Sequence, residues 1–139
     1  MPTIFTRIID GEIPGTFVWR DDRSVAFLSI NPLAHGHVLV VPIAEVDQWT
    51  DLPVDDVTHL TEVSYVIAKA QLAAFAPERI GLIIAGFEVP HVHVHVIPTM
   101  SMADLSFANA AASVSREELD SAAEALRAEL RAAGRTEVV

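Results

Sequence analysis

The chain has 139 residues, of which 51% are hydrophobic and none is cysteine, which fits a single domain with one core and excludes disulfides and cysteine metal sites. Its net charge of −10 argues against nucleic acid as a partner, because a polyanion requires a basic surface, but leaves room for one nucleotide in a local pocket. No apolar run approaches the roughly 18 residues of a membrane span and the N-terminus lacks a signal-peptide pattern, so we expect a cytoplasmic protein with no membrane partner.

The N-terminal part of the chain predicts a short helix followed by three strands. We expect the helix over residues 3–9, where apolar side chains recur at helical spacing. Strands are expected over 17–20 and 24–28, on either side of a short polar turn. The continuous apolar run 37–42 is typical of a strand in the centre of a sheet.

The middle of the chain predicts a long amphipathic helix and a further strand. Residues 54–75 carry an apolar stripe that includes Leu60 and Ile67, and Asp51 is a candidate N-cap for this helix. Residues 79–85 are predominantly apolar and are expected to form the next strand.

The C-terminal part predicts a loop and a terminal helix. Residues 99–112 are small, polar and weakly patterned, so we expect a loop that lies over the body of the protein. Ser115 and Glu118 have the spacing of a capping box, and the apolar stripe that follows ends at Gly134. This helix packs either on its own sheet or on a partner subunit.

Residues 90–98 read Pro-His-Val-His-Val-His-Val-Ile-Pro, and this strict alternation predicts a strand. The pattern places His91, His93 and His95 on one face, which we expect to face solvent, with the valines in the core. Imidazoles titrate near neutral pH and cost free energy to bury, so a row of three predicts a functional site and not an ordinary sheet face.

Two chemistries can use such a row. A His-x-His pair can supply two ligands to a metal ion, with a third ligand from elsewhere in the chain. In the other, His93, as the middle residue, attacks an electrophilic centre while its neighbours orient the substrate or transfer protons.

The histidine run resembles the signature of the histidine-triad (HIT) superfamily, in which histidines alternate with apolar residues. The resemblance covers about residues 3–98, so we interpret 1–139 as a single HIT domain with a core at 3–98 and a C-terminal extension at 99–139. Further segments that match in the family's order are Ile4-Phe5, Ile8-Ile9, Glu12-Ile13-Pro14, Asp21-Asp22, Ala26-Phe27, Ile30-Asn31-Pro32, Gly36-His37 and Val40-Val41-Pro42.

The resemblance implies an α+β, HIT-like fold, with about five mainly antiparallel strands, a long packed helix and a C-terminal helix. It implies a homodimer with continuous sheets, and a purine nucleotide or nucleotide conjugate as ligand. The implied activity is hydrolysis of nucleoside phosphoramidates or related conjugates at the α-phosphate through a nucleotidyl-histidine. The alternatives are a dinucleoside polyphosphate hydrolase, and a nucleotide-binding or regulatory protein with weak or no turnover.

The resemblance also suggests a role for each candidate residue. His93 is the expected nucleophile, His91 and His95 orient and polarise the phosphate and leaving group, and His37 completes the site. No cofactor is implied. The candidate nucleotide-binding residues are Ile4, Phe5, Ile8, Phe27, Ser29, Ile30, Asn31, Leu39, Gly86 and Glu88.

The chain departs from the family pattern in three places. Thr3 and Thr6 stand where many bacterial relatives have a Cys-x-x-Cys zinc half-site, so we expect no bound metal. Ser29 replaces an acid that binds ribose, which predicts weaker ribose recognition. Phe87 and Glu88 replace polar residues of a phosphate-binding loop, and the loop is short. A carboxylate at Glu88 repels phosphate if it points inward, but it has little effect if it points outward.

Overall fold

The computed structural model describes all residues from 1 to 139. Its centre is one five-stranded sheet in the order β1-β2-β3-β5-β4, and every pair of neighbouring strands is antiparallel. The strands are β1 (Phe17–Arg20), β2 (Ser24–Leu28), β3 (Val38–Pro42), β4 (Arg79–Ile83) and β5 (Val94–Thr99). The predicted α+β class with a five-stranded antiparallel sheet is confirmed.

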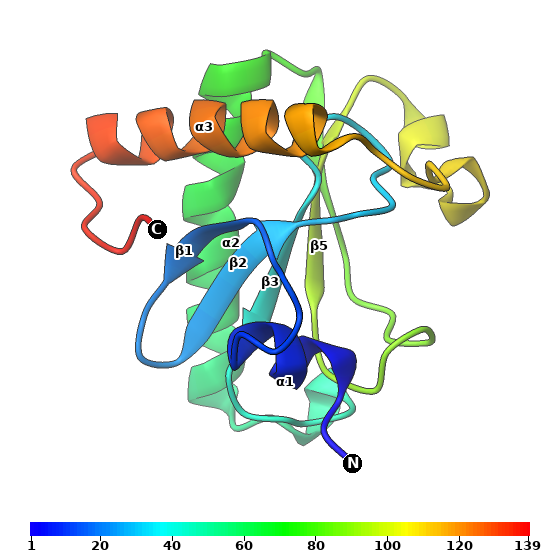
Figure 1. Cartoon of the computed structure of the whole chain (residues 1–139), viewed down its shortest axis with the longest axis vertical. Helices are drawn as coiled ribbons and strands as arrows, with labels where there is room; N and C mark the ends of the chain where they lie inside the picture. The colour runs from blue at the N-terminus through cyan, green and yellow to red at the C-terminus, as the bar shows by residue number, and fades with distance from the viewer.

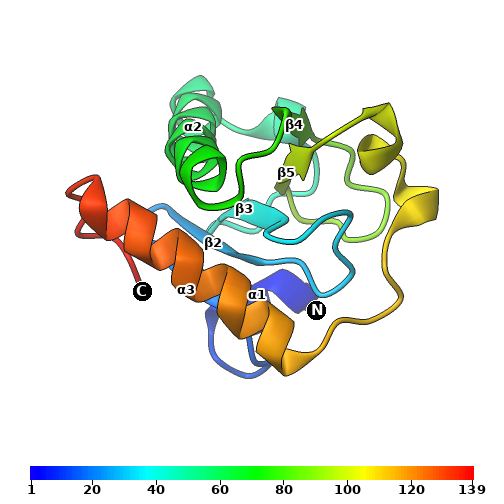
Figure 2. The same ribbon diagram turned by 90° about the horizontal axis from the view of Figure 1, so that it is seen from above.

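Three α-helices surround the sheet (Figures 1 and 2). They are α1 (Ile4–Ile9), α2 (Val54–Phe75) and α3 (Arg116–Ala132). Helix α2 covers one face of the sheet, α1 covers part of the other, and α3 crosses one end, where it contacts α2, β1 and β2. None of these helices combines the length and the apolarity needed to cross a membrane.

Strand β3 is buried along its whole length because both faces of the sheet are covered there. Val38 and Val40 pack into the larger core under α2 and α3, whereas Leu39 and Val41 point to the smaller core under α1. Side chains alternate between the two faces of a strand, so a strand covered on both sides is apolar at every position. Burial of both faces of β3 thus explains the continuous apolar run in the sequence.

Helix α2 differs from the sequence prediction at its start. Pro53 occupies the N-cap position without a side-chain hydrogen bond, and Asp51 lies in a preceding 3₁₀ turn, so the prediction of Asp51 as the cap was wrong. Asp55 and Asp56 in the first turn still favour the positive end of the helix dipole. The buried face contains the predicted stripe together with Val63 and Gln71.

Helix α3 packs on its own chain. The Ser115 hydroxyl accepts a hydrogen bond from the Glu118 backbone N–H at 3.1 Å, as the capping pattern predicted. Beyond the helix the chain returns to the sheet, where the Arg20 N–H donates to the Glu137 carbonyl oxygen. An isolated bridge between Trp19 and Val138 adds to this contact, so the C-terminus covers the outer edge of β1.

The histidine strand is shorter than the alternation predicted. Strand β5 begins only at Val94, and the backbone N–H groups of His91 and Val92 are held by other contacts. The His91 N–H donates to the Val89 carbonyl in a tight turn, and the Val92 N–H donates to the Val46 carbonyl, both at 2.8 Å. His91 and His93 therefore precede the paired part of the strand.

Candidate active site

Four histidine side chains gather beside β5 and are almost fully buried. His37 directly precedes β3, and His95 pairs with Leu39 on β3 and with Ile83 on β4. The exposed fractions are 0% for His91, 2% for His93, 6% for His95 and 1% for His37. The prediction that the row faces solvent was wrong, because α1 and the segment after β5 cover this face of the sheet.

His93 has its proton placed by the backbone. Its Nδ1 lies 2.7 Å from the His91 carbonyl oxygen, which can only accept a hydrogen bond. Nδ1 therefore carries the proton and Nε2 keeps a lone pair. Burial lowers the pKa of His93, although the hydrogen bond to His91 and the charge of Glu88 oppose this effect. The result is a neutral imidazole with a nucleophilic nitrogen at neutral pH.

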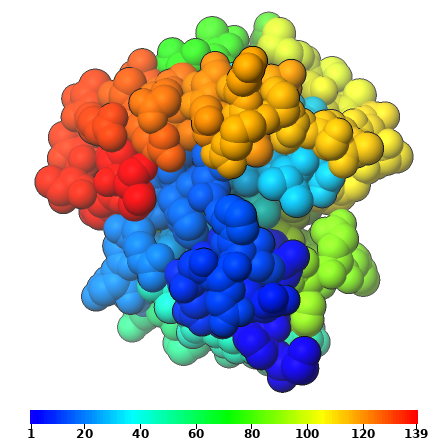
Figure 3. All heavy atoms as spheres, viewed as in Figure 1, coloured from blue at the N-terminus to red at the C-terminus, as the bar shows by residue number.

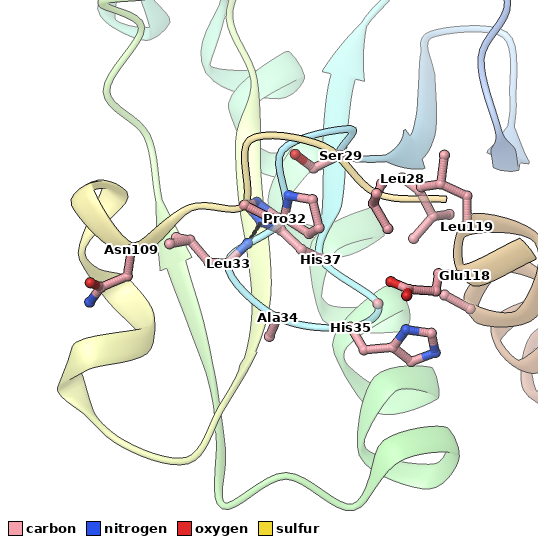
Figure 4. A pocket seen from close by; sticks show the side chains of 14 residues that line it. Leu28, Ser29, Pro32, Leu33, Ala34, His35, His37, Asn109, Glu118 and Leu119 are labelled. Carbon is pink, nitrogen blue, oxygen red and sulfur yellow. Dashed lines mark hydrogen bonds between the residues drawn. The ribbon is translucent and has the colours of Figure 1, made fainter. Parts of the chain in front are cut away.

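A second chain of hydrogen bonds fixes the protons of His37 and His95, and Figure 4 shows its first link, between Leu33 and His37. The Leu33 backbone N–H donates to His37 Nδ1 at 3.0 Å, so the proton of neutral His37 is on Nε2. His37 Nε2 lies 3.0 Å from His95 Nδ1 and donates to it. His95 must then carry its own proton on Nε2.

That His95 Nε2–H is buried and has no hydrogen-bond partner in the protein. Burial lowers the pKa of His95 to about 4 and that of His37 to about 3, and the neighbouring imidazoles add to both shifts. Both rings are therefore neutral at pH 7. A buried donor without an acceptor costs free energy, which is the condition expected where a ligand oxygen or nitrogen is to be bound.

His91 uses both ring nitrogens within the protein. Its Nε2 donates to the Pro42 carbonyl and its Nδ1 accepts from the Thr3 hydroxyl, both at 2.8 Å. Glu45 holds this end of α1, because its Oε1 accepts from the Thr3 N–H and the Thr6 hydroxyl at 2.7 Å. Thr3 and Thr6 thus form part of a hydrogen-bonded network that positions His91. The contribution of Glu45 was not predicted from the sequence.

Aromatic rings enclose the histidines. Phe5 of α1 packs edge-on against His93, with ring centroids 4.9 Å apart, and also contacts His91 and Phe27. Phe107 packs edge-on against His95 at 4.8 Å. The loop expected over 99–112 contains two 3₁₀ turns and covers the site. Phe107 was missed because one aromatic residue in a weakly patterned segment carries no periodic signal.

The other candidate nucleotide-binding residues are spread over two regions. Phe27 and Leu39 are buried in the smaller core with Phe5, Ile8 is partly buried, and Ile4 is exposed. Ile30 is 67% exposed.

The Ser29 hydroxyl accepts a hydrogen bond from the Asn31 N–H at 3.2 Å. The Asn31 amide donates to the carbonyls of Ala111 and Ala112, so it anchors the covering segment to this loop. A cavity of about 270 Å³ adjoins Ser29 and His37, between their loop and the start of α3 (Figure 4).

Glu88 points toward the histidines. One of its carboxylate oxygens, a ring nitrogen of His93 and a ring nitrogen of His95 lie within 4.8 Å of one another. Gly86 has a φ of +86°, which permits the sharp change of direction in this short loop. Two histidines and a carboxylate are zinc ligand types, but both nitrogens of His95 are occupied by the proton and the bond to His37. We therefore assign no metal here.

Gln71 of α2 is a further buried residue that the sequence did not reveal. Its side-chain amide donates to the carbonyls of Gly36 and Val96, at 2.9 and 2.8 Å. Gly36 has a φ of +87°, and a Cβ there would lie 2.2 Å from the Phe75 ring. Gln71 and Phe75 thus fix the loop that leads into His37 against β5.

This fold and its alternating histidines define a histidine-triad protein. The profile of the HIT domain matches residues 10–102, and the chain belongs to the HIT family.

Two relatives with named activities are similar to it in sequence. The purine nucleoside phosphoramidase of Escherichia coli is 34% identical over 101 residues, which is 68% of this chain and 85% of that protein. The adenylylsulfatase HINT3 of Arabidopsis thaliana is 30% identical over 100 residues, covering 68% of this chain and 51% of that protein.

A similar solved structure is a HIT-like protein involved in cell-cycle regulation from Bartonella henselae. It has a TM-score of 0.82 and 30% identity, and the match covers 92% of this chain and 96% of that chain. The long C-terminal helix and the segment before it are thus included in a fold that this HIT protein shares.

Proposed function

We propose that this protein is a nucleotide-binding hydrolase that cleaves nucleoside phosphoramidates or related conjugates at the α-phosphate, with His93 as the nucleophile. The observation that carries the proposal is the placement of two protons. His93 presents a lone pair on Nε2, and the adjacent His95 presents a proton on its unpartnered Nε2. A nucleophile beside a proton donor suits displacement of a basic leaving group.

In the first step the His93 Nε2 lone pair forms a bond to the α-phosphorus, and the bond from phosphorus to the amine nitrogen breaks. The electron pair of the broken bond stays on nitrogen, which takes a proton from water while the neutral His95 donates a hydrogen bond from Nε2–H to the departing group. His93 keeps its Nδ1 proton on the His91 carbonyl, so the nucleotidyl-histidine carries a positive ring. That charge makes the phosphorus–nitrogen bond easier to break in the next step.

In the second step a water molecule attacks the phosphorus. Its proton goes to solvent, and the bond to His93 Nε2 breaks, so that His93 becomes neutral again. The products are the amine and the nucleoside monophosphate, and both histidines end in their starting protonation states. His95 thus stays neutral and acts in both steps as a hydrogen-bond donor.

We propose positioning roles for the other two histidines. His91 acts through its carbonyl oxygen, which orients His93, because both of its ring nitrogens are occupied. His37 fixes the proton of His95. Ile4 and Ile8 of α1, which are exposed and partly buried, offer an apolar surface for the base above the core of Phe5, Phe27 and Leu39.

The names of the two relatives support this assignment and also define its main competitor. A phosphoramidase releases an amine, whereas an adenylylsulfatase releases an acid. A dinucleoside polyphosphate hydrolase likewise releases an anionic nucleotide. The proton on His95 Nε2 favours the phosphoramidase reaction, because an amine must be protonated to leave whereas sulfate need not be.

We also propose that the protein is a homodimer joined at β4. This strand is at the edge of the sheet and exposes apolar side chains, with Leu82 52% exposed and Ile84, directly after the strand, 40% exposed. An unpaired, apolar edge strand is a surface suited to pairing with a second copy.

The test is release of AMP from adenosine 5′-phosphoramidate. We expect His93→Ala to lower kcat by at least a thousandfold in protein that is still folded, although the loss of a buried ring lowers the thermal midpoint. Imidazole added to His93→Gly should restore part of the activity. His35→Asn is the control, because His35 is an exposed histidine outside the row. If His93→Ala retained a tenth or more of the wild-type rate, His93 would not be the nucleophile.

A further inference from the structure

Glu88 brings an uncompensated negative charge to the proposed reaction centre. One carboxylate oxygen lies within 4.8 Å of a ring nitrogen of His93 and of one of His95. The three nearby imidazoles His37, His93 and His95 are neutral, and no ion pair of the structure includes Glu88. The carboxylate is on the exposed side of the site, where a leaving group must depart.

The segments around the histidines lie on one face of the molecule. Helix α1, the loop containing Ser29, the segment that carries Glu88 and the segment before α3 all reach the surface on one face of the molecule (Figure 3). Phe87 is 96% exposed and points away, so the loop directs its carboxylate, and not its aromatic ring, toward the histidines.

We propose that Glu88 is a specificity-determining residue that selects conjugates with an amine leaving group and disfavours those with an anionic leaving group. This inference rests on the proposed function. It names the substrate class as nucleoside phosphoramidates, in preference to adenylyl sulfates and dinucleoside polyphosphates.

The selection follows from charge. The α-phosphate carries one negative charge in all three substrate classes, so its repulsion by Glu88 is common to them. The leaving groups differ, because an amine departs neutral and then takes up a proton to become a cation, whereas sulfate or a nucleotide departs as an anion. In an in-line displacement the leaving atom lies about 5 Å from the attacking nitrogen. The charge of the Glu88 carboxylate, which lies within 4.8 Å of a ring nitrogen of His93, therefore acts on the leaving group.

The protons balance with water alone. The amine nitrogen takes its protons from water as the bond to phosphorus breaks and after the amine leaves, while neutral His95 only donates a hydrogen bond from Nε2–H. Glu88 exchanges no proton. Its effect is electrostatic, so added salt should weaken it.

The experiment compares kcat/KM for adenosine 5′-phosphoramidate and adenosine 5′-phosphosulfate in the wild type and in Glu88→Gln. We expect the variant to shift the ratio toward the phosphosulfate by about three- to tenfold, and the shift to shrink at high salt. Glu62→Gln is the matched control, because it removes the same charge from α2, which covers the opposite face of the sheet. Its ratio should stay within about twofold of the wild type.

A binding measurement extends the test to protein that does not turn over. AMP carries nearly one more negative charge than adenosine 5′-phosphoramidate at pH 7.5, because the second phosphate pKa is about 6. Glu88→Gln should therefore tighten binding of AMP more than binding of the phosphoramidate.

Each outcome decides between the proposals. An unchanged kcat/KM ratio would overturn the selectivity proposal and leave the proposed function intact. An equal fall of kcat on both substrates would also overturn it, because Glu88 would then act on the shared hydrolysis step. If the wild type released AMP from neither conjugate, the proposed function would fail, and the ratio of dissociation constants alone would decide the role of Glu88.

Discussion

The protonation state of each histidine depends on one backbone group. The His91 carbonyl places the proton of His93 on Nδ1, and the Leu33 N–H acts through His37 to place the proton of His95 on Nε2. His93 therefore presents a lone pair and His95 presents a proton, although they are two residues apart in the same alternating run. Backbone groups cannot titrate, so this division does not change with pH until the rings themselves are protonated.

Ser29 gives the prediction at the residue scale. The family resemblance implies a ribose-binding acid at this position, and the Ser29 hydroxyl already accepts the Asn31 N–H. We expect the wild type to bind AMP less than about tenfold more tightly than dAMP, because a charge-assisted hydrogen bond of about 1.5–3 kcal/mol is missing. Ser29→Asp should improve binding of AMP more than that of dAMP. Isothermal titration of both ligands measures the effect.

A different result would locate the ribose contact elsewhere. If the wild type preferred AMP by more than about tenfold, or about 1.4 kcal/mol, another group would have replaced the missing acid. Ser29→Ala is the control, because it removes the hydroxyl and adds no charge.

At the scale of elements, the two edges of the sheet differ in whether another part of the chain covers them. The C-terminal residues cover β1, with backbone bonds between Arg20 and Glu137 and between Val139 and Val18. Strand β4 has no such cover, and its pattern of burial is the most exposed of the five strands. The contrast supports β4 as the edge that receives a second copy of the chain.

We expect sedimentation equilibrium to give about twice the chain mass of 15.1 kDa. Leu82→Glu places a charge at the β4 edge and should weaken the dimer by at least tenfold, or about 1.4 kcal/mol. Val54→Glu is the matched control, because Val54 is also exposed and apolar but lies at the start of α2. A wild-type protein that is monomeric at micromolar concentration would contradict the prediction.

At the scale of the whole molecule, the buried histidines link stability to pH. Burial lowers the pKa of all four, with His37 at about 3 and His95 at about 4. In the unfolded chain these side chains titrate near 6.5. Between about pH 4 and 6.5 the unfolded chain therefore binds protons that the folded protein does not.

The free energy of unfolding should thus be independent of these groups above about pH 6.5 and fall as the pH drops below it. The slope is about 1.4 kcal/mol per pH unit for each imidazole that remains neutral when folded. Urea unfolding at several pH values between 4.5 and 7.5 measures it. His95→Gln should show a shallower slope by about one such group, whereas His35→Asn should not. Equal slopes in wild type and His95→Gln would disprove the linkage.

The sequence alone determined the α+β class, the order of the elements and the identity of the histidine group, because these depend on local periodicity and on a specific motif. Helix α1, the strands up to Pro42 and the capped helix α3 were predicted close to their observed bounds for the same reason. The start of α2 was not, because Pro53 and not Asp51 occupies the N-cap position.

Only the tertiary structure decided which nitrogen carries each proton and which side chains face the site. Phe107 contacts His95 from 12 residues further along the chain. Glu45 and Gln71 act indirectly, through Thr3 and through the carbonyls of Gly36 and Val96. No local pattern encodes such contacts. The inward direction of Glu88 likewise depends on a loop whose conformation is set by Gly86 and by the turn at His91. The burial of the histidine row depends on α1 and the segment before α3, which cover one face of the sheet.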